Sequence, residues 1–191
     1  DAMILTINPA ATASAAADAT ICSGSNYTLA GTIGGGATSS LWTSSGTGAF
    51  DDAALLIAAY TPSAADITAG TVTLTITTTG ACPSANDAMT LTLDKAAAAN
   101  AGSNDVMCSG SSYTLSGTIS GGASTSGWTT SGTGIFDDAT LLTATYTPSA
   151  ADTTTGSVTL ILTTDDPAGV CPALSDAMTL TLDPAATADA G

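Results

Sequence analysis

Strict alternation of apolar and polar residues is the clearest pattern along this chain. In residues 72–77, Val, Leu and Ile alternate with Thr, and residues 158–163 largely repeat that order. Met and Leu alternate with Thr again in 89–93 and in 178–182. Period-two segments of this kind predict antiparallel strands with one face in a core and the other in water. The branched Cβ of Thr also suits a pleated strand.

Glycine-rich turns separate these strands at close intervals, for example at 34–36 and 46–48, with counterparts in the second half of the chain. Helix signals are weak throughout. The Ala-rich stretches 10–19 and 95–101 lack an amphipathic stripe, so we predict an extended connector that becomes the first edge strand. The chain is therefore expected to be almost entirely β-structure.

The sequence contains two copies of one repeat unit. Residues 22–95 recur at 108–184, and Trp42 returns 86 positions later as Trp128. After an insertion of three residues near 165–167 the offset becomes 89. A period of this length is typical of independently folded domains in tandem, and the single insertion indicates a surface loop.

The repeat also predicts the domain boundaries. Two units are expected, at 9–95 and 96–184. Residues 1–8 match the final strand of a unit, and 185–191 match the start of one, which indicates a window from a longer array. We expect 1–8 to be a strand of a preceding repeat that completes a sandwich there or in a neighbouring copy. No signal peptide is visible.

About seven short strands per unit, a central Trp and a pair of Cys predict an all-β fold, namely tandem immunoglobulin-like antiparallel β-sandwich domains. The chain has only two Trp and two Phe, so we expect the core to need them as bulky anchors. The alternative is an aromatic platform for a sugar ring, formed in each unit by one Trp, one Phe and one Tyr: Trp42, Phe50 and Tyr60, and Trp128, Phe136 and Tyr146. The predicted core anchors are Trp42, Phe50, Trp128 and Phe136.

Each unit contains two Cys at matching places, and the chain has no His. Paired Cys without His predict one disulfide per unit, Cys22–Cys82 and Cys108–Cys171, in an oxidising compartment. Each bridge is expected to join loops or strand ends. Closing a loop of about 60 residues is worth roughly 4 kcal/mol in the chain-entropy model. The other two pairings, and a metal site built from four thiolates, remain open.

The charge balance excludes two classes of partner. All sixteen acidic residues are Asp, the only cation is Lys95, and the net charge is −15. Binding to nucleic acid or to an anionic membrane requires clusters of Lys and Arg, which this chain lacks. No apolar run approaches the roughly 20 residues of a membrane-spanning helix, so we expect no membrane insertion.

Carboxylates recur at equivalent places in both units, and oxygen ligands suit Ca²⁺. Their spacing does not follow an EF-hand loop, and Asp also caps turns through its side chain. Turn chemistry is therefore the main expectation, with no cofactor, and Ca²⁺ is the alternative. The carboxylates concerned are Asp51, Asp52, Asp66, Asp137, Asp138 and Asp152.

Catalysis is not expected. A Ser or Cys nucleophile needs a base, and the chain has neither His nor Glu. Paired carboxylates can hydrolyse a glycoside, but we do not expect a catalytic site duplicated in two small repeats without a sizeable cleft. One modification signal is the N-glycosylation sequon that begins at Asn26.

The motifs of the unit resemble a known family. Residues 22–25, 42–50, 60–66 and 70–74, repeated within 108–160, are similar to the repeat of very large surface proteins of Bacteroidetes, including gliding-motility-type adhesins exported by the type IX system. The resemblance implies long extracellular stalks or filaments of Ig-like modules that carry adhesion at their tips or along their length. Asp152-Thr153-Thr154 also resembles the O-glycan acceptor of Bacteroidetes, with Thr153 as the modified residue.

These observations lead to three hypotheses about function. The first is a structural repeat module of a cell-surface adhesin or extracellular filament, stapled by disulfides, whose partners are neighbouring repeats or filament copies. The second is a glycan-binding module that uses exposed Thr, Asp and Tyr. The third is a surface-layer lattice protein with ordered lateral contacts.

Overall fold

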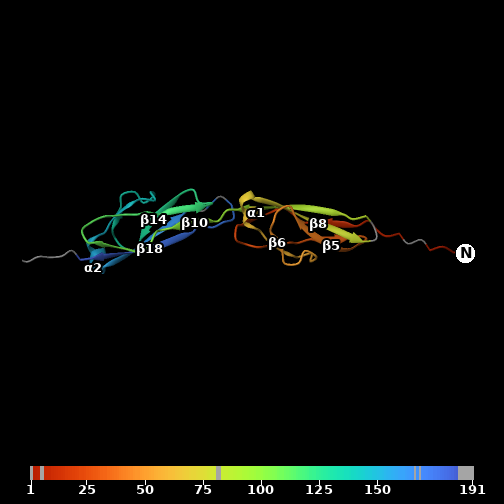
Figure 1. Ribbon diagram of the computed structural model, residues 1–191, viewed down its shortest axis with the longest axis horizontal. Coiled ribbons are helices and arrows are strands. Elements are labelled where there is room, and N and C mark those ends of the chain that lie inside the picture. The colour runs from red at the N-terminus through yellow and green to blue at the C-terminus, as the bar shows by residue number, and fades with distance from the viewer. Residues whose placement is uncertain (1, 5–6, 81–82, 166, 168, 185–191) are drawn as a thin grey trace, which may run out of the picture. The chain divides into compact units, whose positions relative to one another are not determined.

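The computed structural model describes residues 2–4, 7–80, 83–165, 167 and 169–184. The chain divides into two compact units, Asp1–Lys95 and Ala96–Gly191 (Figure 1). Each unit has its own sheets and its own buried cluster.

The larger sheet of the first unit has the strand order β2-β9-β8-β5. Its strands are β2 (Ala19–Cys22), β9 (Asn86–Asp94), β8 (Thr71–Gly80) and β5 (Ala37–Ser44). All neighbours are antiparallel except β2 and β9, which pair in parallel from Ala19 opposite Leu91 to Cys22 opposite Asp94. The first strand of this sheet therefore runs beside the last strand of the unit in the same direction.

Short strands form the second layer. They are β1 (Thr12–Ser14) with β4 (Thr32–Gly34), and β3 (Tyr27–Thr28) with β7 (Ala59–Thr61) and β6 (Ala49–Phe50). The connector predicted as an edge strand is split between the layers, because β1 and β2 pair in different sheets. Ala16, between them, has a φ of 70°, a left-handed conformation uncommon for a residue with a side chain.

The second unit repeats this topology. Its larger sheet consists of β11 (Asp105–Cys108), β18 (Ser175–Asp183), β17 (Ser157–Thr164) and β14 (Ser126–Thr130), in that order. Its short strands are β10 (Ala97–Asn100) with β13 (Thr118–Gly121), and β12 (Tyr113–Thr114), β16 (Thr145–Thr147) and β15 (Ile135–Phe136). The predicted fold class, tandem Ig-like β-sandwiches, is confirmed, with one parallel pair added in each unit.

Each unit also contains one short helix that the sequence analysis did not expect. These are α1 (Ala64–Ala69) and α2 (Ala150–Thr155). In α1 the Ser63 side chain accepts from the backbone N–H of Asp66, and the Asp66 side chain accepts from that of Ser63, which is a capping box. Gly70, at a φ of 80°, ends the helix in the left-handed conformation that glycine adopts readily. Hydrogen bonds at its two ends thus stabilise this short helix, which has no amphipathic stripe in its sequence.

The alternating segments form the two cores. Val72, Leu74 and Ile76 are buried on one face of β8, while Thr73 on the other face is exposed. Trp42 packs in the same cluster and is 2% exposed. The equivalent Trp128 is 3% exposed in the second core, which has its own separate set of residues. Each unit therefore buries an independent core.

The aromatic Phe side chains lie at the margin of these cores. Phe50 and Phe136 are half-buried and pack against the buried clusters. Their rings meet those of Tyr60 and Tyr146 with centroids 5.0 Å apart in both units. Tilted pairs at this separation suit the ring quadrupoles.

The described residues of the segment 1–8 form no strand. Met3, Ile4 and Ile7 are 87%, 91% and 82% exposed, so these side chains do not pack onto the unit that follows. The pairing of 1–8 with another unit stays a prediction. Among the residues that the structure describes, no helix has the length and apolar character needed to cross a membrane.

Replacing Trp42 by Ala tests the core of the first unit. Removing a buried indole should destabilise that unit by about 3–5 kcal/mol, because lost burial adds to the cost of a cavity. In guanidinium titrations followed by circular dichroism, we expect the transition to split into two. Trp128 fluorescence then reports the second unit alone, which should unfold as in the parent. Leu41→Ala, at an adjacent exposed position, is the control, and a Trp42→Ala chain as stable as the parent would contradict the assignment.

Candidate functional site

A buried carboxylate in the first unit accepts four hydrogen bonds. Asp66 is 3% exposed. Its Oδ1 accepts from the backbone N–H of Thr47 at 2.9 Å. Its Oδ2 accepts from the backbone N–H of Gly48 at 2.9 Å, the Tyr60 hydroxyl at 2.8 Å and the backbone N–H of Ser63 at 3.0 Å. One side chain thus joins the 46–48 loop, strand β7 and the start of α1.

The second unit contains the same arrangement around Asp152, which is also 3% exposed. Its Oδ1 accepts from the backbone N–H of Thr133 at 2.8 Å. Its Oδ2 accepts from the Tyr146 hydroxyl and from the backbone N–H of Ser149, both at 2.9 Å. The repetition shows that the carboxylate cluster belongs to the unit and is independent of its neighbours.

The 46–48 loop needs glycine at both of its ends because it passes very close to this carboxylate and its neighbours. A Cβ added at Gly46 would overlap the Oδ1 of Asp66. A Cβ at Gly48 would lie 2.5 Å from the Tyr60 hydroxyl oxygen and from the carbonyl oxygen of Thr61. Only glycine therefore lets the backbone N–H groups approach the carboxylate at hydrogen-bond distance.

Sequence reasoning missed this cluster, although a signal was present. The Gly-rich loop alone indicates a turn, and Asp66 alone suggests a capped turn or a Ca²⁺ ligand. The Ser-x-x-Asp spacing from Ser63 to Asp66, directly after Pro62, is the signature of a capping box. That spacing could have placed both a helix and an inward-facing carboxylate here.

The hydrogen bonds keep the carboxylate ionised. Burial by itself raises the pKa of Asp66, but the backbone N–H groups of Ser63 and Thr47, with the hydroxyls of Tyr60 and Ser63, lower it to about 2. The pKa of Asp152 is about 2 for equivalent reasons. Burial raises the pKa of the Tyr60 hydroxyl, and the neighbouring Asp66 carboxylate raises it further. Hydrogen bonds with Ser44 and Gly48 act in the opposite direction. At neutral pH the hydroxyl therefore donates and the carboxylate accepts.

This arrangement positions backbone and does not perform proton transfer. A general base must take up a proton near the working pH, and a carboxylate with a pKa of about 2 is a poor acceptor there. Both oxygens of Asp66 are already occupied by donors from the protein. Its chemical role is to hold a loop and a helix terminus together.

The remaining Ca²⁺ candidates cap exposed turns. Asp51 Oδ1 accepts from the backbone N–H groups of Asp52 and Ala59 at 2.7 and 2.8 Å, and Asp52 Oδ1 accepts from that of Ala54 at 2.9 Å. In the second unit, Asp137 accepts from the N–H groups of Asp138 and Thr145, and Asp138 accepts from that of Thr140. Within the described ranges, no three potential ligands among Asp, Cys, Glu and His gather as a metal site would require. The geometry follows the turn interpretation.

The cysteines depart from the predicted pairing. Cys22 and Cys171 each take part in a disulfide, whereas Cys108 is free and exposed. The predicted Cys108–Cys171 bridge is therefore not formed. Cys82, the expected partner of Cys22, lies outside the described residues.

The reason lies in the topology of the second unit. Cys108 is opposite Asp183, the last residue of β18, in the parallel pair β11–β18. Cys171 precedes Ser175, the first residue of β18, by four positions. Eight residue steps of a strand span about 26 Å, and four residues of chain reach back about 14 Å at most. The two Cα atoms are thus well beyond the roughly 7 Å that a disulfide tolerates.

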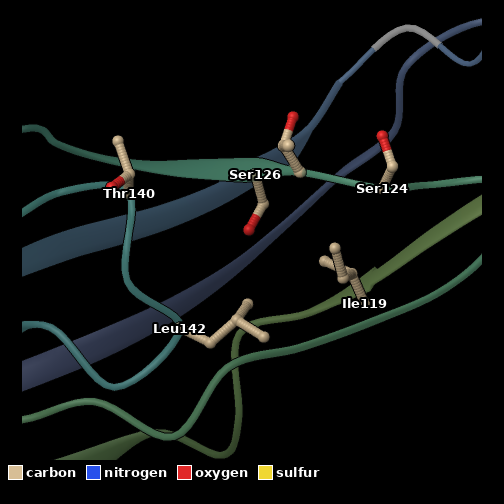
Figure 2. Close-up of a pocket in the computed structure, with 6 residues that line it drawn as sticks. Ile119, Ser124, Ser126, Thr140 and Leu142 are labelled. Carbon is tan, nitrogen blue, oxygen red and sulfur yellow. The ribbon is translucent and has the colours of Figure 1, made fainter.

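Both Trp side chains are buried, so neither ring is available to stack on a sugar in the aromatic platform considered above. Tyr27 and Tyr113 are half-buried, and the Tyr113 hydroxyl donates to Asp105 at 2.8 Å. A depression of about 420 Å³ opens on the second unit (Figure 2). Hydroxyl and aliphatic side chains line it, and no aromatic or charged residue does: Ile119, Ser124, Thr125, Ser126, Thr140 and Leu142.

The two predicted glycosylation positions differ in accessibility. Asn26 is exposed in the turn between β2 and β3. Thr153 is half-buried in α2, and its hydroxyl donates to the carbonyl oxygen of Ser149 at 3.1 Å. The Asp152 of its motif is buried in the carboxylate cluster, so enzymatic recognition of that motif would require the folded helix to open.

Comparison with known proteins identifies the fold. No protein-family model and no curated protein matches the chain. Among solved structures, the insect immune protein hemolin is 10% identical with a TM-score of 0.53, over 90% of this chain and 46% of that one. Sidekick-1 immunoglobulin domains 1–4 are 12% identical with a TM-score of 0.47, over 92% of this chain and 49% of that one. At this level of identity the similarity shows an Ig-like β-sandwich and nothing finer.

The double variant Asp66→Asn/Asp152→Asn tests the carboxylate clusters. An amide nitrogen would face N–H and O–H donors, so we expect a loss of roughly 1–3 kcal/mol per unit. The folded pKa of about 2 lies below the ordinary value of 3.8. Each carboxylate therefore adds roughly 2 kcal/mol of stability above about pH 5, which is lost as the pH falls towards 2.

Urea titrations between pH 2 and pH 7 measure this effect. The parent should lose more stability on acidification than the double variant, and Asp52→Asn/Asp138→Asn is the matched control in exposed turns. Parallel pH profiles for the parent and the cluster variant would show that the buried carboxylates are not the source.

Gly132→Ala tests the close approach in the second unit. The new Cβ would overlap the Oδ1 of Asp152, so the loop must shift and release hydrogen bonds, at a cost of about 2–4 kcal/mol. Gly127→Ala is the control, because a Cβ there has only the carbonyl oxygen of Ala139 at 4.0 Å. In thermal melts, Gly132→Ala should have a melting temperature several degrees below that of Gly127→Ala. Equal melting temperatures would show that the loop accommodates the added methyl group.

Proposed function

We propose that this chain is a structural repeat module of a long extracellular adhesin or cell-surface filament, in which Ig-like units carry tension and hold adhesive parts away from the surface. The observation that carries the proposal is the parallel pairing of the first and last strands of the larger sheet in each unit, β2 with β9 and β11 with β18.

This pairing determines how a unit responds to pulling. Tension applied through the chain on either side of a unit draws β2 and β9 along their common axis in opposite directions. Hydrogen bonds that lie across that axis then share the load and must break together, whereas an antiparallel hairpin pulled from its open end breaks one bond at a time. Ser23 extends the ladder, because its N–H donates to the Asp94 carbonyl oxygen at 2.7 Å. Ser109 and Asp183 do the same at 2.8 Å.

Composition and comparison support the same proposal. The units are near copies of each other, similar to the repeat of large Bacteroidetes surface proteins, and a spacer needs repetition more than it needs a site. The domain arrangement of hemolin is described as having implications for homophilic adhesion by that protein. An oxidising, extracellular setting agrees with the two disulfide-bonded Cys.

Glycan binding is the second candidate function, and the depression beside Ile119 and Leu142 is the observation that favours it (Figure 2). Its hydroxyl groups can hydrogen-bond a sugar, but it has no aromatic ring on which a sugar can stack.

A glycan array probed with the labelled chain separates the two functions. A spacer should show no saturable binding to any glycan. Saturable binding that is lost in Thr140→Ala and Ser126→Ala chains, with their folding unchanged, would favour the glycan-binding module instead.

Single-molecule pulling tests the mechanical role directly. Under reducing conditions, where no disulfide carries load, each unit should unfold in one sharp event at high force. Ser23→Pro removes the N–H that donates to Asp94 and should lower the unfolding force of the first unit only. Ser23→Ala, which keeps that N–H, is the control. A force equal in both variants, or gradual unfolding of the parent at low force, would contradict the load-bearing proposal.

A further inference from the structure

The depression on the second unit lies beside strand edges of both layers of the sandwich. It lies between β13 and β14, next to the segment that contains Thr140 and Leu142. β14 is the outermost strand of the larger sheet, and β13 is one of the two strands of the sheet β10-β13. Strand edges carry backbone donors and acceptors that can pair with a further extended chain.

Hydrogen bonds show in which direction the backbone of β14 points. The N–H of Trp128 donates to the carbonyl oxygen of Ala139 at 2.8 Å, on the side away from β17. Alternate residues of an antiparallel strand direct their backbone groups to the same side. Ser126, two residues before Trp128, therefore directs its N–H and C=O groups towards the open side, where it lines the depression.

The same argument applies to the strand on the other side of the depression. The N–H of Gly117 donates to the carbonyl oxygen of Leu142 at 3.0 Å. Ile119 is two residues further along and lies in β13, so its backbone groups also point to this side. An extended segment laid in the depression would therefore meet backbone donors and acceptors.

The side chains provide a place for an aliphatic group. Ile119 and Leu142 are half-buried and pack against the core of the unit. Figure 2 shows them on one side of the depression, with Ser126 on the other. A volume of about 420 Å³ is sufficient for a branched side chain and the backbone that carries it. Pockets for alternate side chains are what give strand addition its specificity.

Two carboxylates lie directly behind residues that line the depression. Asp165 accepts from the N–H groups of Ser124 and Thr125 at 2.9 and 3.1 Å, and Asp138 accepts from the N–H and hydroxyl of Thr140 at 2.9 and 2.7 Å. Hydrogen bonds from Ser124 lower the pKa of Asp165, and those from Thr140 lower the pKa of Asp138. Both groups are therefore ionised at neutral pH, and in a chain with a net charge of −15 they favour a basic partner.

We propose that this depression binds an extended basic peptide segment of a partner protein by strand addition at the edge of β14. A branched aliphatic side chain of the peptide enters between Ile119 and Leu142. Lys or Arg side chains on either side of it approach Asp138 and Asp165. A peptide suits the site better than a sugar, because strand edges recognise backbone and no aromatic ring lines the depression. The inference goes beyond the proposed stalk function and does not rest on it.

The first unit differs at the positions that matter. Ala54 takes the place of Thr140, and Ser39 pairs with Thr79 where Thr125 of the second unit bonds to Asp165. The proposal therefore assigns the peptide site to the second unit, and the first unit serves as an internal control within the same chain.

A titration of the isotope-labelled full chain, followed by NMR, tests the proposal. The probe is a peptide of sequence Lys-Thr-Val-Thr-Lys with blocked ends. We expect saturable shifts of the Ser126 and Ile119 amide signals, while those of the first-unit counterparts Ser40 and Ile33 stay unchanged. No saturable shift, or equal shifts at Ser40 and Ser126, would overturn the proposal.

Charge variants test the ionic part. Asp138→Asn and Asp165→Asn keep an oxygen that can accept the turn hydrogen bonds, and each should weaken binding about two- to fivefold, as expected for an exposed ion pair. Asp52→Asn, the first-unit counterpart of Asp138→Asn, changes the net charge equally and should leave the affinity unchanged. An Asp-Thr-Val-Thr-Asp peptide that binds as tightly as the basic one would contradict the assignment.

Peptide variants test the pairing without altering the protein. Replacing the central Val by Ser should weaken binding roughly tenfold, because the aliphatic contact is lost. Two further peptides carry N-methyl groups at alternate residues, and only the one whose methyl groups face β14 should lose binding. Equal affinity of these two peptides would show that no strand pairing takes place and would overturn the proposal. None of these readouts depends on mechanical strength or glycan binding.

Discussion

The parallel hydrogen-bond ladder between the first and last strands of the larger sheet is the constraint on which each unit depends. Because β9 pairs with β2 on one side and β8 on the other, it joins the two ends of the unit to its centre. In the second unit the equivalent strand, β18, lies between Cys108 and the loop that contains Cys171. The parallel pairing of the outer strands and the separation of these two Cys are thus two results of one arrangement.

A second constraint is the near absence of cations. A buried carboxylate usually needs a positive partner, and removing it from water is costly. Here Asp66 is stabilised by backbone N–H groups and a phenol, with glycines that allow the loop to approach. The donors to this internal charge are thus backbone N–H groups and a hydroxyl, in place of a Lys or Arg side chain.

Some of this structure follows from the sequence and some does not. The alternation of Val72, Leu74 and Ile76 with Thr predicted strands and their buried face, because side-chain direction in a strand follows position alone. It did not predict that β2 would run parallel to β9, since alternation says nothing about a strand's neighbour. The Asp66 cluster was missed because most of its donors come from backbone, which leaves little mark on residue identity. The prediction of a Cys108–Cys171 bridge was wrong for a related reason: two Cys of one repeat can form a bridge only if both lie at the same end of the sandwich. The distance between Cys108 and Cys171 becomes clear only once β18 is known to run between them.

The carboxylate cluster has a consequence for how adjacent near-copies avoid exchanging strands as they fold. Misassembly between similar neighbours is a characteristic failure of tandem repeats. Asp66 collects its donors from residues 3, 6, 18 and 19 positions away, while the equivalent donors of the other unit are 86 positions further along. Short loops close at lower entropic cost than long ones, so this cluster favours partners from its own unit. A repeat built in this way can be nearly identical to its neighbour and still fold as an individual.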